Sequence, residues 1–179
     1  MLFRSCFYHA DHLPPLPMEY VTPVFDIDWI YPEPETPGQK TIRIVHAPSK
    51  FQQTRFCYDL YKAFGALKSE YFKNEPMSYY DWHCDIKRNC GINFLLNDVK
   101  DALTLYMIEG DVRLNGTIIN VIPKLYRPVL LDTTVRHCVL NWSNETRYIL
   151  SVGLHDPDVG FADVKEFLEK YPISDSMYR

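Results

Sequence analysis

The middle of the chain, from about residue 66 to residue 155, alternates apolar and polar positions in short segments. This period-two pattern is typical of β-strands that bury one face. Turn-forming residues separate the segments at intervals of about 8 to 12 residues, which favours a β-sandwich or barrel. We predict strands at 67–72, 78–85, 91–96, 103–109, 111–114, 117–122, 126–132, 136–141 and 147–153.

A tight hairpin is predicted at Asn115-Gly116, between the strands at 111–114 and 117–122. Asn and Gly readily adopt the positive φ angles that two-residue hairpin turns require. This dipeptide is therefore the strongest hairpin signal in the chain, and it lies near the middle of the predicted core.

Helices are predicted on both sides of this strand-rich region. A strand at 41–46 is followed by a helix that runs from Ser49, its candidate N-cap, to about Phe64. Apolar residues recur in it at helical spacing, and Gly65 is a natural terminator. The same spacing after the core predicts a C-terminal helix at 158–171.

Residues 1–40 form a proline-rich N-terminal arm. Seven of the 13 prolines fall between Pro14 and Pro37, which prevents a long regular element. The arm is nevertheless too apolar for a disordered segment. We expect it to wrap over the core at 66–155, with a short extended piece at about 20–30, so that residues 1–179 form a single domain.

The composition is that of a globular protein, with 46% hydrophobic and 15% aromatic residues. No apolar run is long enough to span a membrane. A net charge of −4 without a basic stripe argues against binding to nucleic acid or to an anionic membrane. Five irregularly spaced cysteines indicate reduced thiols, and no signal peptide is evident, so we expect a cytoplasmic protein.

Candidate chemistry begins with His83 and Asp85, which lie two residues apart at the end of a predicted strand and so share one face. A second His-x-Asp, at His9 and Asp11, precedes the prolines and has no matching partner downstream, so we interpret it as part of the surface. His137 follows an apolar strand and a short polar bend.

Taken singly, these residues have ordinary explanations. His83 and His137 could each be a hydrogen-bonded core histidine, and Arg147, at the start of an apolar strand, could extend its charge to the surface. Together they predict more. Two imidazoles and one carboxylate form the facial triad that holds non-haem Fe(II) with open positions. An arginine ten residues beyond the second histidine can clamp a carboxylate group.

Strand period places other polar residues near this site. Asn93 is the candidate inward residue of the third strand, or else an amide at a strand edge. Ser151 shares the face of Arg147, and Tyr79 and Asp81 share the face of the first candidate histidine.

Basic residues and thiols also lie close to the candidate ligands. Lys87, Arg88 and Arg136 could attract an acidic substrate, or could simply be solvated. Cys84 and Cys138 each neighbour a candidate ligand and therefore point to the opposite strand face, where we expect buried structural thiols. The same alternation argues against a zinc site that combines thiols with the histidines.

The motif His83-Cys84-Asp85, the distant His137 and Arg147 ten residues later resemble the signature of the Fe(II)/2-oxoglutarate-dependent dioxygenases. The similarity covers about residues 66–155. The run Asn89-Cys90-Gly91-Ile92-Asn93-Phe94 looks most like the aspartyl/asparaginyl β-hydroxylase-like branch, and the chain is also similar to short oxygenases of bacteriophages. Its carboxylate ligand distinguishes it from the aspartyl β-hydroxylases proper, which lack one.

This resemblance implies a mainly β fold, a double-stranded β-helix (jelly roll, cupin-like) with one or two flanking helices. It implies that His83, Asp85 and His137 bind Fe(II) and are the catalytic residues. An aspartate at the position that halogenases of this family leave open for chloride implies hydroxylation or demethylation.

The resemblance also implies that 2-oxoglutarate is bound by Arg147, with help from Asn93 and Ser151. O2 would be the oxidant, succinate and CO2 the co-products, and ascorbate a stimulant. The expected substrate is a peptide side chain, an amino acid or a small metabolite. If phage-encoded, the enzyme would act in a bacterial host cytoplasm.

Two non-catalytic alternatives stay open at this point. One is a cupin-like metal- or ligand-binding module, and the other is a structural jelly roll in which the histidines are accidental. Arg147 distinguishes the first from an oxygenase, because a metal-binding module needs no buried cation ten residues beyond its last ligand. Metal content would distinguish the structural alternative.

Overall fold

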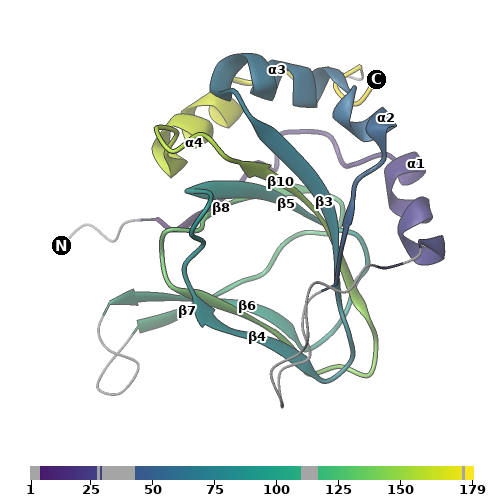
Figure 1. Cartoon of the computed structure of the whole chain (residues 1–179), viewed down its shortest axis with the longest axis vertical. Coiled ribbons are helices and arrows are strands. Elements are labelled where there is room, and N and C mark those ends of the chain that lie inside the picture. The colour runs from purple at the N-terminus through teal and green to yellow at the C-terminus, as the bar shows by residue number, and fades with distance from the viewer. Residues whose placement is uncertain (1–4, 28, 30–42, 110–116, 175) are drawn as a thin grey trace.

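The computed structural model describes residues 5–27, 29, 43–109, 117–174 and 176–179. Its strands are β1 (Phe7–His9), β2 (Arg43–His46), β3 (Leu67–Asn74), β4 (Ser78–His83), β5 (Cys90–Leu95), β6 (Ala102–Glu109), β7 (Thr117–Val121), β8 (Pro128–Asp132), β9 (His137–Asn141) and β10 (Arg147–Leu154). They form two antiparallel sheets that face each other (Figure 1).

The larger sheet, sheet A, has the order β1-β8-β5-β10-β3-β2, and the smaller one, sheet B, has the order β4-β9-β6-β7. Strands β3, β5, β8 and β10 thus lie in one sheet, and β4, β6, β7 and β9 in the other. This arrangement is a double-stranded β-helix, and it confirms the predicted fold class.

The predicted hairpin falls partly outside the described residues. The strand at 111–114 and the Asn115-Gly116 turn lie there, so both stay predictions. The flanking strands β6 and β7 do pair in antiparallel fashion, with Glu109 opposite Thr117.

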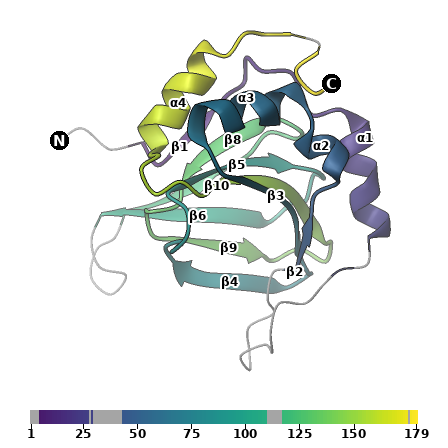
Figure 2. The ribbon, with the colours of Figure 1, turned by 45° about the horizontal axis from the view of Figure 1, so that its top comes forward.

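The helices are α1 (Met18–Val21), α2 (Ser49–Gln52), α3 (Arg55–Phe64) and α4 (Phe161–Lys170), with a 3₁₀ helix, η1, at Thr22–Asp26. Helices α2, α3 and α4 lie over the outer side of sheet A (Figures 1 and 2). None of the helices in the described residues is long and apolar enough to cross a membrane.

The prediction of one continuous helix from Ser49 to Phe64 is wrong. The helix is divided before Thr54, whose hydroxyl accepts a hydrogen bond from the backbone N–H of Cys57 and so caps α3. Ser49 is the first residue of α2 and not its cap. Gly65 does end α3, with a φ of 75° that favours glycine.

The N-terminal arm is more regular than its prolines indicate. The extended piece predicted near residues 20–30 is wrong for the described part, because residues 18–26 form α1 and η1. Pro23 lies in the first turn of η1, where a missing N–H costs no hydrogen bond. The arm also adds β1 to the edge of sheet A, with Phe7 opposite Leu131.

The main hydrophobic core lies between sheet A and the helices. On β10, Leu150, Val152 and Leu154 are buried in one cluster with Phe56 of α3 and Leu168 of α4. The alternate residues of β10 face sheet B instead. Because the helices supply most of the apolar packing, the space between the sheets can contain polar groups.

The arm is expected to fold cooperatively with this core, because Leu13 is fully buried in it. Leu13→Ala should lower the free energy of unfolding by about 2–5 kcal/mol, through lost apolar burial and a residual cavity. Chemical denaturation followed by tryptophan fluorescence measures the loss. Met18→Ala, at a position of the arm that is 54% exposed, is the control and should change stability by less than about 0.5 kcal/mol. Equal effects would contradict the role of the arm.

Candidate active site

The candidate metal ligands meet where β4 pairs with β9. His83, the last residue of β4, lies directly opposite His137, the first residue of β9. Asp85 follows in the loop after β4. The ligand atoms of the three side chains lie within 4.8 Å of one another, and His83 Nε2 is 3.5 Å from Asp85 Oδ1. Small adjustments would let all three bind one ion at about 2.1 Å.

Hydrogen bonds to the backbone orient both imidazoles. His83 Nδ1 lies 2.6 Å from the carbonyl oxygen of Asp81, and His137 Nδ1 lies 2.9 Å from that of Val135. A carbonyl oxygen only accepts, so each Nδ1 carries the proton and donates it. Each Nε2 therefore keeps a lone pair for a metal ion, as metal-binding histidines require.

A guanidinium group holds one oxygen of the Asp85 carboxylate. Arg88 Nε donates to Asp85 Oδ2 over 2.6 Å, which leaves Oδ1 beside His83. Burial alone would raise the pKa of the Asp85 carboxyl group. The charge and the hydrogen bond of Arg88 help to outweigh burial, so that the pKa lies well below its usual range. Asp85 is therefore ionised at neutral pH.

His137 is neutral at the same pH, because burial lowers the pKa of its imidazole. The ring of Tyr106 on β6 stacks on it, with 5.3 Å between ring centroids. Asp85 and His137 are thus in the protonation states that metal binding needs.

The residues that share the face of His83 differ from the prediction. A β-bulge between Tyr80 and His83 shifts the register, so that Tyr80 pairs with Val139. The Tyr80 ring therefore contacts the His83 ring, at 4.1 Å between centroids. The placement of Tyr79 on this face is therefore wrong, because strand period two does not hold across a bulge, whereas the placement of Asp81 stays a prediction.

The loop that carries Asp85 is tied to the bend between β8 and β9. The backbone N–H of Asp85 donates to the Thr133 carbonyl, over 3.0 Å. Thr133 Oγ1 donates to the carbonyl of Arg88, over 2.8 Å, and Thr133 N–H donates to the carbonyl of Asn89. These bonds fix the third ligand although it lies outside a regular strand.

Arg147 is one of the largest fully buried side chains in the described residues. Its Nη2 donates to Thr104 Oγ1 over 3.0 Å and its Nη1 to the Leu103 carbonyl over 3.4 Å, while Nε has no partner. No carboxylate of the described residues pairs with it. Burial lowers the pKa of Arg147 to about 10, which corresponds to a cost on the order of 3 kcal/mol at neutral pH.

Arg147 belongs to a narrow pocket between the sheets. The pocket is lined by Asn93, Leu95, Thr104, Val121, Pro123, Val129, Leu131, Arg147 and Ile149. Buried polar atoms without a partner in the described residues include Asn93 Oδ1 and the hydroxyl of nearby Tyr106. The free volume of about 10 Å³ approaches what one water molecule needs. A larger anion would have to part these side chains.

The two residues predicted to assist Arg147, Asn93 and Ser151, lie in different surroundings. Asn93 lies in the same pocket as Arg147. Ser151 lies directly opposite Asn93 across β5 and β10, but its hydroxyl accepts a hydrogen bond from Arg88 Nη1, over 3.2 Å. Sequence reasoning missed Thr104, which accepts a hydrogen bond from Arg147 and lines its pocket, because nothing in the neighbouring sequence marks it as a pocket residue.

Comparison with solved structures places this geometry in a known fold. A prolyl-4-hydroxylase from Pseudomonas putida has a TM-score of 0.60 at 16% identity, with 84% of this chain and 92% of that chain covered. A prolyl hydroxylase from Trichoplax adhaerens, in complex with a hypoxia inducible factor peptide, has a TM-score of 0.58 at 13% identity, with 84% and 83% covered. The chain has the same fold as these two prolyl hydroxylases.

A third structure with this oxygenase fold contains both a metal and the co-substrate. It is HygX from Streptomyces hygroscopicus with nickel and 2-oxoglutarate bound, with a TM-score of 0.56 at 10% identity and 79% of this chain and 78% of that chain covered. By sequence, the chain matches neither a protein-family model nor a curated protein. At these identities the likeness extends to the fold, so the site rests on its own geometry.

The cysteines do not belong to the site. Cys138 is buried, as predicted. Cys84 is exposed, so the prediction of a buried thiol is wrong at that position. Strand β4 ends at His83, and the alternation of side-chain faces does not continue beyond it. Burial raises the pKa of the Cys138 thiol to about 11, so it stays protonated. Among the described residues, no group suited to a metal ion combines thiols with histidines.

The second His-x-Asp forms no site within the described residues. His9 lies in β1, and Asp11 pairs with Lys124 at 2.5 Å. The triad of His83, Asp85 and His137 is the only group suited to a metal ion that the described part contains.

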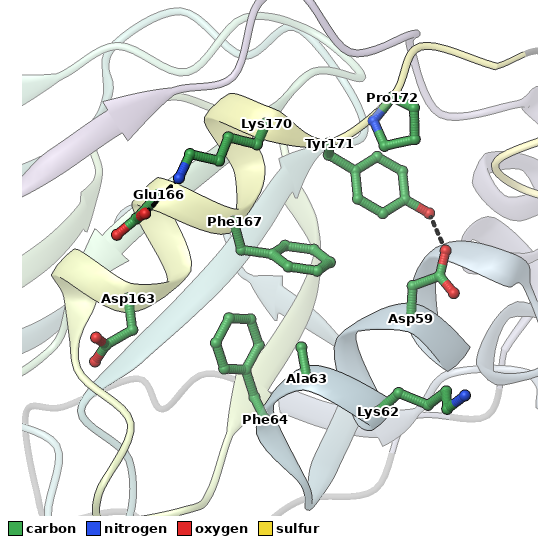
Figure 3. A pocket seen from close by; sticks show the side chains of 10 residues that line it. All are labelled: Asp59, Lys62, Ala63, Phe64, Asp163, Glu166, Phe167, Lys170, Tyr171 and Pro172. Atoms are coloured by element: carbon green, nitrogen blue, oxygen red, sulfur yellow. Dashed lines mark hydrogen bonds and ion pairs between the residues drawn. The ribbon is translucent and has the colours of Figure 1, made fainter.

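A wider groove lies on the helical layer, between α3 and α4 (Figure 3). Phe64 and Phe167 meet edge to face at its floor, and the hydroxyl of Tyr171 donates to Asp59 over 2.8 Å. Its polar side chains include surface residues that pair with one another. We assign it no chemistry.

The triad is expected to bind one divalent ion. His83→Ala should weaken Co(II) binding, measured anaerobically by calorimetry and by the visible absorption of the ion, by at least about 100-fold, because it removes a direct ligand. His9→Ala, which disrupts the other His-x-Asp, is the matched control and should leave affinity and spectrum unchanged. Comparable losses in both variants would place the ion elsewhere.

The buried charge of Arg147 should cost stability in the absence of a ligand. Arg147→Met removes that charge and keeps most of the volume, so it should raise the free energy of unfolding at pH 7 by about 1–3 kcal/mol. The gain should shrink above pH 10 or so, where the buried guanidinium begins to lose its proton. Thermal denaturation at pH 7 and pH 10.5 measures both effects. A destabilised variant at pH 7 would show that Arg147 has a purely structural role.

Proposed function

We propose that the chain is an Fe(II)- and 2-oxoglutarate-dependent oxygenase, and specifically a hydroxylase. The observation that carries this proposal is the combination of an open three-ligand site with the buried guanidinium of Arg147, which has no carboxylate partner among the described residues. A metal-binding module accounts for the ligands but not for a buried cation that costs stability. A structural jelly roll accounts for neither.

The donor set fits Fe(II). His83, Asp85 and His137 would hold the ion on one face and leave positions for a chelating co-substrate and for O2. With 2-oxoglutarate and O2, the bound iron supplies oxidation of an unactivated C–H bond, with release of succinate and CO2. Since the aspartate fills the third protein position, the site favours hydroxylation over halogenation. Ascorbate, which keeps iron reduced, is expected to stimulate turnover.

Arg147 would bind the distal carboxylate of 2-oxoglutarate. Its unpaired Nε–H supplies a donor, and burial makes the attraction stronger than it would be in water. Thr104 and Asn93 lie in the same pocket, so their side chains could contact the same carboxylate group. The buried hydroxyl of Tyr106 also lacks a partner in the described residues and could donate to a ligand that opens the pocket.

The substrate is proposed to be a small molecule or a peptide. The Trichoplax adhaerens prolyl hydroxylase was solved with a peptide, which supports the second class by analogy of fold. The acidic net charge disfavours nucleic acid. All five cysteines are unpaired, which fits action in a reducing cytoplasm.

Succinate formation from 2-oxoglutarate, with Fe(II), ascorbate and air, tests the proposal. The wild type should show slow turnover without substrate, and His137→Ala none. Arg147→Gln should need about 10- to 100-fold more 2-oxoglutarate for half-maximal rate, because a charge-assisted hydrogen-bond pair is lost. The control is Arg136→Gln, at an exposed position beside the site, and it should match the wild type.

Some oxygenases turn over only with substrate present, so binding is measured in parallel. Calorimetry should detect 2-oxoglutarate binding that depends on a divalent ion. A wild-type protein that produces no succinate and binds no 2-oxoglutarate in the presence of metal is not an oxygenase of this class.

A further inference from the structure

The side chain of Arg88 runs from the metal site onto the inner face of sheet A. Its Nε donates to Asp85 Oδ2 and its Nη1 donates to Ser151 Oγ on β10. Only 21% of the side chain is exposed. This cation is therefore held between a candidate metal ligand and the floor of the barrel.

Two glycines make room for it. Gly91 of β5 and Gly153 of β10 lie directly opposite each other in the sheet. A Cβ atom on either residue would lie 3.2 Å from Arg88 Nη1, and one on Gly153 would also lie 3.3 Å from Arg88 Cδ. A Cβ at either position would be in tight contact with the Arg88 side chain, so the bare backbone of the pair forms a close-fitting seat for it.

The guanidinium retains hydrogen-bonding capacity in this position. It has five N–H donors, and the bonds to Asp85 and Ser151 use two of them. No group in the described residues accepts from Nη2. Ser151 accepts from Arg88, so its own hydroxyl hydrogen can be donated to a ligand. A metal ion bound to Asp85 would share the negative charge of that carboxylate, so Asp85 would neutralise less of the positive charge of Arg88 than in the metal-free site.

The acidic group opposite Ser151 in the sheet is already paired. Glu70 of β3 lies opposite Ser151, and its carboxylate accepts from Lys68 Nζ at 2.7 Å. His155 Nε2 also borders the seat, 3.0 Å from the place of a Cβ on Gly153. The carboxylates of Asp85 and Glu70 near Arg88 are thus both paired with a basic side chain, and His155 adds a polar group at the edge of the seat.

This position is separate from the pocket of Arg147. Ser151 and Arg147 lie on the same face of β10, four residues apart, which is a Cα separation of about 13 Å in a strand. Arg147 is fully buried, whereas Arg88 reaches the surface in part. The two guanidinium groups can therefore bind two different anions.

We propose that Arg88 and Ser151 bind a carboxylate group of the primary substrate and hold it beside the metal site. This inference rests on the proposed function and narrows its substrate to acidic molecules. A free amino acid would supply its α-carboxylate, and a peptide would supply an Asp or Glu side chain. Both offer two oxygens to the remaining donors of the guanidinium group.

Binding of paired probes to the protein loaded with Zn(II) and 2-oxoglutarate tests the proposal. One panel contains the twenty free L-amino acids and their α-amides. The other contains short blocked peptides with Asp or Glu and their Asn or Gln counterparts. The ¹⁵N–¹H signal of Arg88 Nε, assigned by its absence in Arg88→Lys, reports contact at this residue, and calorimetry gives the affinities.

At least one carboxylate probe should bind about tenfold more tightly than its amide. The preference should fall below about twofold in Arg88→Gln and persist in Lys87→Gln, which removes an exposed neighbouring charge. At saturating Zn(II), the affinity for 2-oxoglutarate should stay within about threefold of wild type in Lys87→Gln, and any loss in Arg88→Gln should be smaller than that in Arg147→Gln. The panel that contains the preferred probe identifies the source of the carboxylate.

Three results would overturn the inference. They are the absence of any carboxylate preference in both panels, a preference that survives Arg88→Gln, and a loss of 2-oxoglutarate binding in Arg88→Gln as large as that in Arg147→Gln. The last would assign Arg88 to the co-substrate. Metal and 2-oxoglutarate affinities are measured before the probes are added, so a failure of the proposed function is recognised separately.

Discussion

The antiparallel pairing of β4 with β9 is the constraint on which the candidate metal site depends. It places His83 opposite His137, although the two lie far apart in sequence. Each imidazole donates to the backbone carbonyl of the residue two positions before it, which is Asp81 for His83 and Val135 for His137. The backbone that creates the pairing thus also orients the ligands, and no separate side chain is needed to fix either tautomer.

Apolar packing under the helical layer supplies enough stability for polar groups to be buried between the two sheets. Most of the buried apolar surface lies between sheet A and helices α2, α3 and α4, so the space between the sheets need not be a hydrophobic core. That space contains Arg147 without a carboxylate partner among the described residues, at a cost on the order of 3 kcal/mol. Such a cost is typical of a residue kept for binding rather than for stability.

Much of the barrel could be predicted from the sequence, because half-buried antiparallel strands repeat a two-residue pattern that turn residues interrupt. The prediction was wrong where local geometry departs from that pattern. A bulge brings Tyr80 instead of Tyr79 to the face of His83. The end of β4 exposes Cys84. In the arm, prolines indicated irregular structure, yet Pro23 occupies the first turn of a short helix that tolerates it.

The sequence by itself indicated the candidate ligands, since the His-x-Asp spacing, a distant histidine and an arginine ten residues beyond it single out His83, Asp85 and His137. It also placed Arg147 ten residues after His137 in the sequence. Only the tertiary structure decided what Arg88 does. Asp85 and Gly91 lie three residues to either side of it, whereas Ser151 and Gly153 belong to the distant strand β10, which pairs with β5 and so comes to lie beside it. Local periodicity cannot encode contacts that depend on which strands become neighbours.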